Sequence, residues 1–529
     1  MTWEMLRRGR WSLPTAALGA NALPLLLFTV LQHDGALDPT EKSQIMMHIV
    51  VVQIHVLLFG IFVFGAIGAP ARLYALPIRT SSLVTLQLLE GMSAVAAELV
   101  LSTMLLNAAF GLGWPLLGWP LLGPALFGAV AASTILAMLW FTEKSAWIFV
   151  AIGLAGSVLG LWLKSHYGPM FSPPSHYWAV VTPVDALTLI LATLLAYWIG
   201  VAGVSRNRCG EPPLSVGLIA WFERVFAATP QDGLAFRTPA DAQFWFEWRT
   251  KGPALPAMVI MGLVMGFGIW LIGIRESKAL YEGLVSGGAL LVLGGFLGGF
   301  VFGNLGRPDS HLQIGHFLAT RPISTTEIAR SVLKCAAKGL LIAWTIWAVA
   351  FFALYALLWS LGVGFMLSMP APLGWWYLPA TLVGAWAAMG VLTPVALAGR
   401  QTLAAVLIFG SVALFVGLLL LSKYALSREG QEQFFQGSLV ACGIALMLGT
   451  AWAFSAARRR SLIGGPTLIV ASVVWVALCT LVALQRLSSL GTSHPAERLP
   501  LYIAAVGILA LAVSPLATAP LALAWNRNR

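Results

Sequence analysis

Apolar runs of about 20 residues recur along the whole chain, a length that lets a helix cross the lipid bilayer. This feature limits the possible folds more than any other. Hydrophobic residues make up 59% of the 529 residues and charged residues only 10%. A soluble domain carries roughly 25% charged residues, so this chain has too little charge to cover a water-facing surface. The sequence therefore predicts an all-α polytopic membrane protein.

Hydropathy predicts about fourteen membrane-spanning helices. Their expected bounds are 13–31, 45–68, 83–107, 121–140, 146–163, 182–204, 254–274, 283–303, 336–366, 376–398, 402–422, 434–456, 463–484 and 500–523. Basic residues favour a cytoplasmic N-terminus and C-terminus, because cytoplasmic segments retain Lys and Arg. In that orientation the basic residues of the outer side are Lys42, Lys164, Arg275, Lys278, Lys423, Arg428, Arg486 and Arg498. Orientation thus accounts for the net charge of +11, and no nucleic-acid partner is expected.

The chain contains an internal repeat. Residues 62–70 read FVFGAIGAP and residues 300–308 read FVFGNLGRP, and a Pro-Ile pair follows each of them, at Pro77-Ile78 and Pro322-Ile323. The first six spans then match the next six with the same orientation, which is a parallel repeat. We expect a first repeat at 1–205, a cytoplasmic linker at 206–253 with an amphipathic helix, a second repeat at 254–460, and an extra two-helix segment at 461–529.

The segment from Phe317 to Ile328, followed by Lys334, resembles the cytoplasmic loop of ABC type-2 transporter permeases, and residues 74–81 resemble it more loosely. The resemblance extends over about residues 1–460, and the first copy departs from it by lacking the Arg-Pro pair. It implies a bacterial inner-membrane exporter subunit that performs no catalysis and binds an ABC-type ATPase, in two copies, which would carry ATP and Mg. It also implies that the loops are coupling elements, with these residues: Leu76, Pro77, Ile78, Arg79, Arg321, Pro322, Ile323, Ser324 and Glu327.

The coupling loops also have a local physical interpretation. A proline ends one element and sets the start of the next helix. Ser324 or Thr325 can cap that start, and Glu327 stands where the acidic residue of a capping box is expected. An ordinary capped cytoplasmic turn would have the same pattern. No phosphate-binding GxxxxGK[ST] motif occurs in the chain, so ATP hydrolysis by that route would require a separate subunit.

Several polar residues fall within predicted spans, where ionisable groups are costly and are candidates for function. Glu90 and Glu98 lie on one face of the third span, and Lys334 and Lys338 lie near the start of the ninth. A Glu90 pair with Lys334 or Lys338 is one hypothesis, and water-exposed groups at the inner boundary are the alternative. His55 shares a helical face with His48, and we expect hydrogen-bonded packing for it rather than haem binding.

The remaining patterns predict packing and exclude other chemistry. Gly295, Gly299 and Gly303 recur at every fourth position, which favours close helix packing. The Cys and His spacings are not those of a metal site. Two other functions stay open: a non-transporting membrane scaffold with a permease-like fold, and a membrane-embedded enzyme that acts on lipid-linked substrates.

Overall fold

The computed structural model describes residues 13–14, 16–21, 24, 55, 59–67, 77–110, 121–142, 181–209, 236, 238–272, 277–305, 323–360, 377–399, 427–488 and 495–527. These residues form helices and the turns that flank them, and none of them lies in a strand. The prediction of an all-α fold is confirmed.

Within the described residues, seven helices are long and apolar enough to cross a membrane. A bent pair of helices near the C-terminus adds an eighth if the pair forms one span. These helices confirm a multi-pass membrane protein. The predicted total of about fourteen is not confirmed. The expected spans at 13–31, 45–68, 146–163 and 402–422 lie wholly or partly outside the described residues, and the helices found at the expected spans 254–274 and 283–303 are not among the seven or eight.

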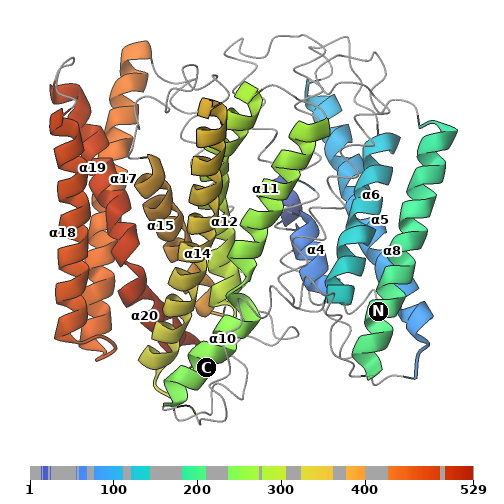
Figure 1. Cartoon of the computed structure of the whole chain (residues 1–529), viewed down its shortest axis with the longest axis horizontal. Helices are drawn as coiled ribbons and strands as arrows, with labels where there is room; N and C mark the ends of the chain where they lie inside the picture. Colours follow the sequence, from blue (N-terminus) through green and yellow to red (C-terminus); the bar gives the residue numbers. More distant parts are fainter. Residues whose placement is uncertain are drawn as a thin grey trace. The chain divides into compact units, whose positions relative to one another are not determined.

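The chain divides into two compact units, which are Met1–Ser215 with Gln401–Ala425, and Val216–Arg400 with Leu426–Arg529. The described helices of the first unit are α4 (Gly60–Ile67), α5 (Thr80–Phe110), α6 (Leu122–Thr142) and α8 (Pro183–Cys209), drawn in blue to blue-green in Figure 1. Helix α6 packs against both α5 and α8. Leu83, Leu99, Leu136 and Trp140 are part of the buried core of this unit.

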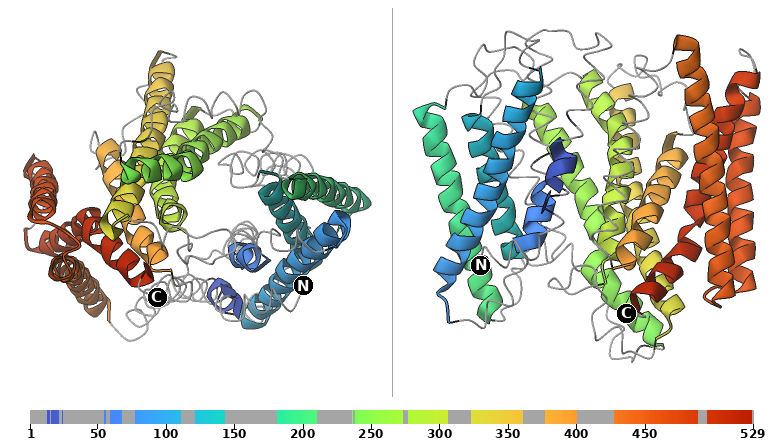
Figure 2. Two further views of the ribbon diagram at one scale, coloured as in Figure 1. Left: turned by 90° about the horizontal axis from the view of Figure 1, so that it is seen from below. Right: turned by 180° about the vertical axis from the view of Figure 1, so that it is seen from behind.

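The second unit contains a larger set of helices, drawn in green to red in Figures 1 and 2. They are α10 (Pro239–Lys251), α11 (Ala254–Ile272), α12 (Ser277–Gly303), α14 (Thr325–Ser360), α15 (Tyr377–Leu397), α17 (Arg428–Arg459), α18 (Gly465–Ser488), α19 (Pro495–Val513) and α20 (Pro515–Arg527). Its core includes Trp248, Phe302, Leu340 and Phe351. Helix α14 begins at Thr325, well before the expected span at 336–366, so the helix extends beyond the apolar run.

Among the described helices of the second unit, α12 and α15 have the most extensive contact. A Cβ atom added to Gly295 would collide with the Ala385 carbonyl oxygen, and one added to Gly299 would lie 2.8 Å from the Met389 carbonyl oxygen. A Cβ atom on Gly303 would likewise meet the backbone of Thr393. The three glycines therefore lie where the two backbones approach each other, as small residues do at helix interfaces in membranes.

The C-terminal helices differ from the expected single span at 500–523. The segments Leu499–Val513 and Pro515–Arg527 meet at an angle of 53°. Pro515 starts the second helix, and a proline has no N–H with which to continue the hydrogen bonding of the preceding helix. Helix α19 packs mainly against α17, whereas α20 packs against α15, α14 and α17.

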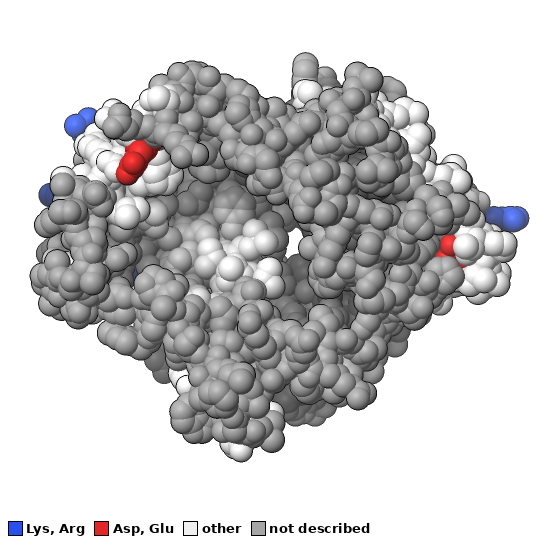
Figure 3. Space-filling model, turned by 90° about the horizontal axis from the view of Figure 1, so that it is seen from above, with Lys and Arg blue, Asp and Glu red and all other residues white. Residues whose placement is uncertain are grey.

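Helices α17 and α18 have largely apolar outer faces, as helices in contact with lipid do. In α18, Ile469, Val473 and Val476 are all more than half exposed. In the view from above in Figure 3, the described atoms include small, separate groups of Lys or Arg and of Asp or Glu.

Candidate functional site

The two repeated Pro-Ile pairs precede helices that begin in the same register. Helix α5 begins at Thr80 and α14 at Thr325, each three residues after the repeated proline. The Arg79 carbonyl oxygen accepts a hydrogen bond from the Leu83 N–H at 3.0 Å, and the Ser324 carbonyl oxygen accepts one from the Ile328 N–H at 3.1 Å. The sequence match between these loops therefore corresponds to a match in local structure.

Ser324 and Glu327 form a reciprocal cap at the start of α14. The Ser324 Oγ accepts a hydrogen bond from the Glu327 N–H at 3.2 Å, and the Ser324 N–H donates to Glu327 Oε2 at 2.9 Å. This is the arrangement of a capping box, and the expected capping by Ser324 and Glu327 is confirmed. Leu76, Arg321 and Pro322 lie outside the described residues, and a coupling role for any of these positions stays a prediction.

At each of these helix starts, a backbone carbonyl accepts a hydrogen bond from an arginine on another helix of the same unit. In the first unit, Arg208 Nη1 donates to the Ile78 carbonyl oxygen at 2.7 Å and to Thr80 Oγ1 at 3.1 Å. In the second unit, Arg527 Nη1 donates to the Ile323 carbonyl oxygen at 2.6 Å. Ile78 and Ile323 are equivalent when Pro77 is matched to Pro322. The same carbonyl is therefore anchored in both repeats.

The residue before each arginine makes a second equivalent contact. Asn207 Nδ2 donates to the Trp140 carbonyl oxygen near the end of α6 at 3.0 Å. Asn526 Nδ2 donates to the Leu397 carbonyl oxygen at the end of α15 at 2.9 Å. Gly399, with φ of 72°, lies against the Asn526 amide, so that a Cβ atom there would collide with the amide.

We call these two pairs, Asn207-Arg208 and Asn526-Arg527, the Asn-Arg clamps. Sequence reasoning missed both. The detectable signal was the Asn-Arg dipeptide in the last turn of an apolar helix in each case.

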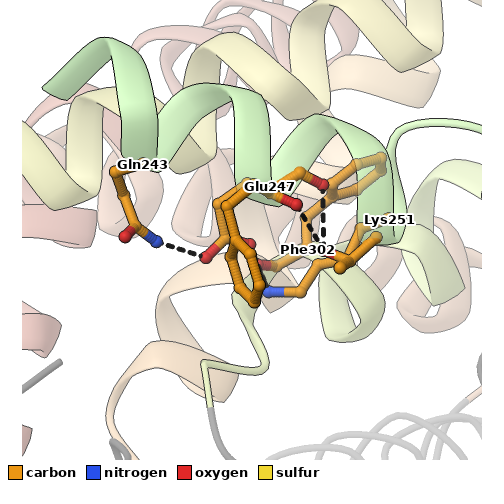
Figure 4. Close-up of polar contacts among 6 residues, drawn as sticks. Gln243, Glu247, Lys251 and Phe302 are labelled. Atoms are coloured by element: carbon orange, nitrogen blue, oxygen red, sulfur yellow. Dashed lines mark hydrogen bonds and ion pairs between the residues drawn. The ribbon is translucent and has the colours of Figure 1, made fainter. Parts of the chain in front are cut away.

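Helix α10 contributes a buried charged pair that lies against the end of α12 (Figure 4). Glu247 is only 2% exposed, and its Oε2 lies 2.5 Å from Lys251 Nζ. Gln243 Nε2 donates to Glu247 Oε1 at 2.8 Å, and Lys251 Nζ donates to the Phe302 carbonyl oxygen at 3.4 Å. The pair thus joins α10 to the C-terminal end of α12. A helix was expected at 243–251, and the structure has one at Pro239–Lys251. Its buried residues are Gln243, Glu247 and Trp248, so its buried face is largely polar.

Three of the candidate charged residues, Glu90, Lys334 and Lys338, do not form one site within either unit. Lys338 Nζ lies 4.1 Å from the centre of the Trp248 ring, a cation–π contact. Lys334 is exposed on the same helix. Glu90 belongs to the first unit and both lysines to the second, so the Glu90 pairing stays a prediction.

A buried polar cluster in the first unit brings together two of the candidate residues. Glu98 is 6% exposed and His55 is fully buried, and His55 Nε2 lies 3.9 Å from Glu98 Oε1. Asn21 Nδ2 donates to the same Glu98 oxygen at 2.6 Å. The sequence identified Glu98 and His55 separately but did not connect them. His48 lies outside the described residues.

No group of three or more His, Cys, Asp or Glu side chains that could hold a metal ion occurs in the described part of the chain. No family model, curated protein or solved structure matches this chain.

Proposed function

We propose that this protein is the membrane-spanning subunit of an ATP-driven ABC exporter, and that it couples a separate ATPase to the movement of a substrate. The observation that carries the proposal is the pair of equivalent helix starts at Thr80 and Thr325, each anchored through the carbonyl of the preceding isoleucine. A helix start that is anchored in this way can transmit an applied displacement to the long helix that follows. Two anchored starts suit a partner that is a dimer.

The proposal includes about fourteen spans, with both repeats in the same orientation and both chain ends in the cytoplasm of a bacterial inner membrane. The internal repeat in the sequence predicts that the extra helix pair is the segment 461–529. The Asn-Arg clamps instead support α20 as the counterpart of α8, because both helices end in the same two contacts. In this arrangement the extra pair is α17 and α18, inserted before the last helix of the second repeat. An inserted pair leaves the orientation of that helix unchanged.

The ATPase partner can be tested by co-expression with an ABC-type ATPase encoded beside this chain. Single cysteines at Arg79 and Thr326 place a thiol at each helix start, and a cysteine at Arg460, at the end of α17, is the matched control. In a chain without its native cysteines, a reagent that joins a thiol to a lysine amine should cross-link the first two positions to the ATPase and should not cross-link Arg460. ATP hydrolysis should rise when the two proteins are reconstituted. Cross-links without any change in hydrolysis would favour the scaffold function, and their absence from both helix starts would refute the coupling role.

A further inference from the structure

We propose that Glu98, His55 and Asn21 form an intramembrane proton-binding site in which Glu98 and His55 share one proton. The inference does not depend on the proposed transport function. It rests on the position of a carboxylate and an imidazole within the same buried cluster, with their nearest atoms 3.9 Å apart.

The cost of charge in an apolar interior determines how many protons such a pair holds. A single unpaired charge buried among helices in a membrane is expensive. With one proton, the pair is neutral overall, either as a carboxylate beside an imidazolium or as a carboxylic acid beside a neutral imidazole. Removing that proton or adding a second one leaves a net charge in the cluster. The one-proton state is therefore the stable one.

The Asn21 amide orients the carboxyl group in both forms of the pair. Its Nδ2 donates to Glu98 Oε1 and also to the Ala17 carbonyl oxygen, at 2.6 Å and 2.8 Å. The amide is thus held by its own helical segment and presents an N–H to the carboxyl oxygen that faces His55. Ser102 lies one turn beyond Glu98 on α5 and is also fully buried, so the polar surroundings continue along the helix.

The other charged or titratable groups of the surrounding helices are engaged elsewhere. The described residues of α6, of α4 and of the segment 13–21 include no ionisable side chain. On α8, Asp185 accepts hydrogen bonds from Thr182, Tyr197 stacks edge-on with Trp198, Arg206 lies over Phe141, and Arg208 belongs to its clamp. The Cys209 thiol is exposed at the last residue of the helix.

On α5 itself, Arg79 precedes the helix, and Glu90 lies eight residues before Glu98, about 12 Å along the axis. Glu90 is partly exposed. Among the described residues, His55 is therefore the ionisable group that faces Glu98.

The test uses the full chain in liposomes and dicyclohexylcarbodiimide, an apolar reagent that modifies protonated carboxyl groups. The carboxyl oxygen bonds to the central carbon of the reagent and the acid proton moves to one nitrogen. The acyl group then migrates to the other nitrogen, which leaves a stable N-acylurea and no leaving group. Peptide mass spectrometry across a pH series locates the adduct. We expect labelling at Glu98 that declines as the pH rises, and none at this position in Glu98→Gln.

The His55→Gln variant tests whether the proton is shared. Without the imidazolium as counter-charge, the Glu98 carboxylate is less favourable, so labelling should persist to a pH about one unit or more higher than in the wild type. Thr103→Val is the matched control, because the Thr103 hydroxyl is buried on the same helix but donates to the Leu99 carbonyl oxygen at 2.7 Å. Its labelling profile should equal that of the wild type.

Infrared spectroscopy over the same pH series does not depend on access of the reagent. A protonated-carboxyl C=O band that is present in the wild type and absent in Glu98→Gln supports the site. Glu98→Gln retains an oxygen that can accept the Asn21 hydrogen bond, so the fold should survive, and an unchanged gel-filtration profile checks this. If the band is unaffected by Glu98→Gln, or if His55→Gln leaves the pH profile unchanged, the shared proton is refuted.

Discussion

At the level of single residues, Arg527 joins two distant parts of the second unit, since it donates a hydrogen bond to a carbonyl 204 positions earlier in the chain. Replacing it with alanine leaves the buried Ile323 carbonyl without this donor. We expect a loss of about 1.5–3 kcal/mol of stability, the usual range for a hydrogen bond to a charged group. Chemical unfolding followed by tryptophan fluorescence in mild detergent measures the loss.

The exposed Arg460, at the end of α17, provides the control for that measurement. Arg460→Ala removes the same charge from a basic run but has no equivalent carbonyl contact to break, and it should leave stability within about 0.5 kcal/mol of the wild type. If Arg527→Ala is as mild as Arg460→Ala, the clamp has no structural role.

The Glu247–Lys251 pair provides a second prediction at this scale. Lys251→Met leaves Glu247 buried without its cation, and breaking a buried pair in this way typically costs about 3–5 kcal/mol. Glu247→Gln alone should also destabilise the protein, because it leaves the lysine unpaired. The double variant should recover a large part of the loss, and a double-mutant cycle from unfolding curves measures this coupling. Strictly additive losses would contradict the ion pair.

At the level of elements, the α12–α15 interface depends on the absence of side chains on one face of α12. Gly299→Ala would place a methyl group 2.8 Å from the Met389 carbonyl oxygen, and relieving that contact should cost about 1–3 kcal/mol. Gly262→Ala in α11 is the matched control, because nothing lies within 4 Å of its added Cβ atom. There the substitution should be neutral or stabilising by up to about 1 kcal/mol.

Local features of the elements were the most predictable from sequence. The start of α14 and its capping box depend on residues within a single turn. The spacing predicted Glu327 and left Ser324 or Thr325 as the cap, and the structure shows that it is Ser324. The Asn-Arg clamps and the Asn21–Glu98 contact could not, since they join positions 67 to 204 residues apart. The apolar pattern also gave no indication of the bend before Pro515, because hydropathy does not depend on helix direction.

At the level of the whole molecule, the proposed orientation can be measured with thiol labelling. In a background without the native cysteines, single cysteines at Arg79, Ser324 and Arg460 should react with a membrane-impermeant maleimide only from the cytoplasmic side. Cysteines at Thr182 and Ser427 should react only from the opposite side. Labelling of Ser324 and Arg79 from opposite sides would refute the parallel repeat, and labelling of Arg460 from outside would refute the insertion of α17 and α18 as a pair.

The bend of 53° between the last two helices has a practical consequence for handling this protein. Helix α20 has only 13 residues and would be an obvious candidate for trimming. Ending the chain at Ser514 would, however, remove both Asn526 and Arg527. It would also remove their hydrogen bonds to the carbonyl oxygens of Leu397 and Ile323. We therefore expect a C-terminal deletion to destabilise the start of α14. Purification tags should accordingly be placed at the N-terminus.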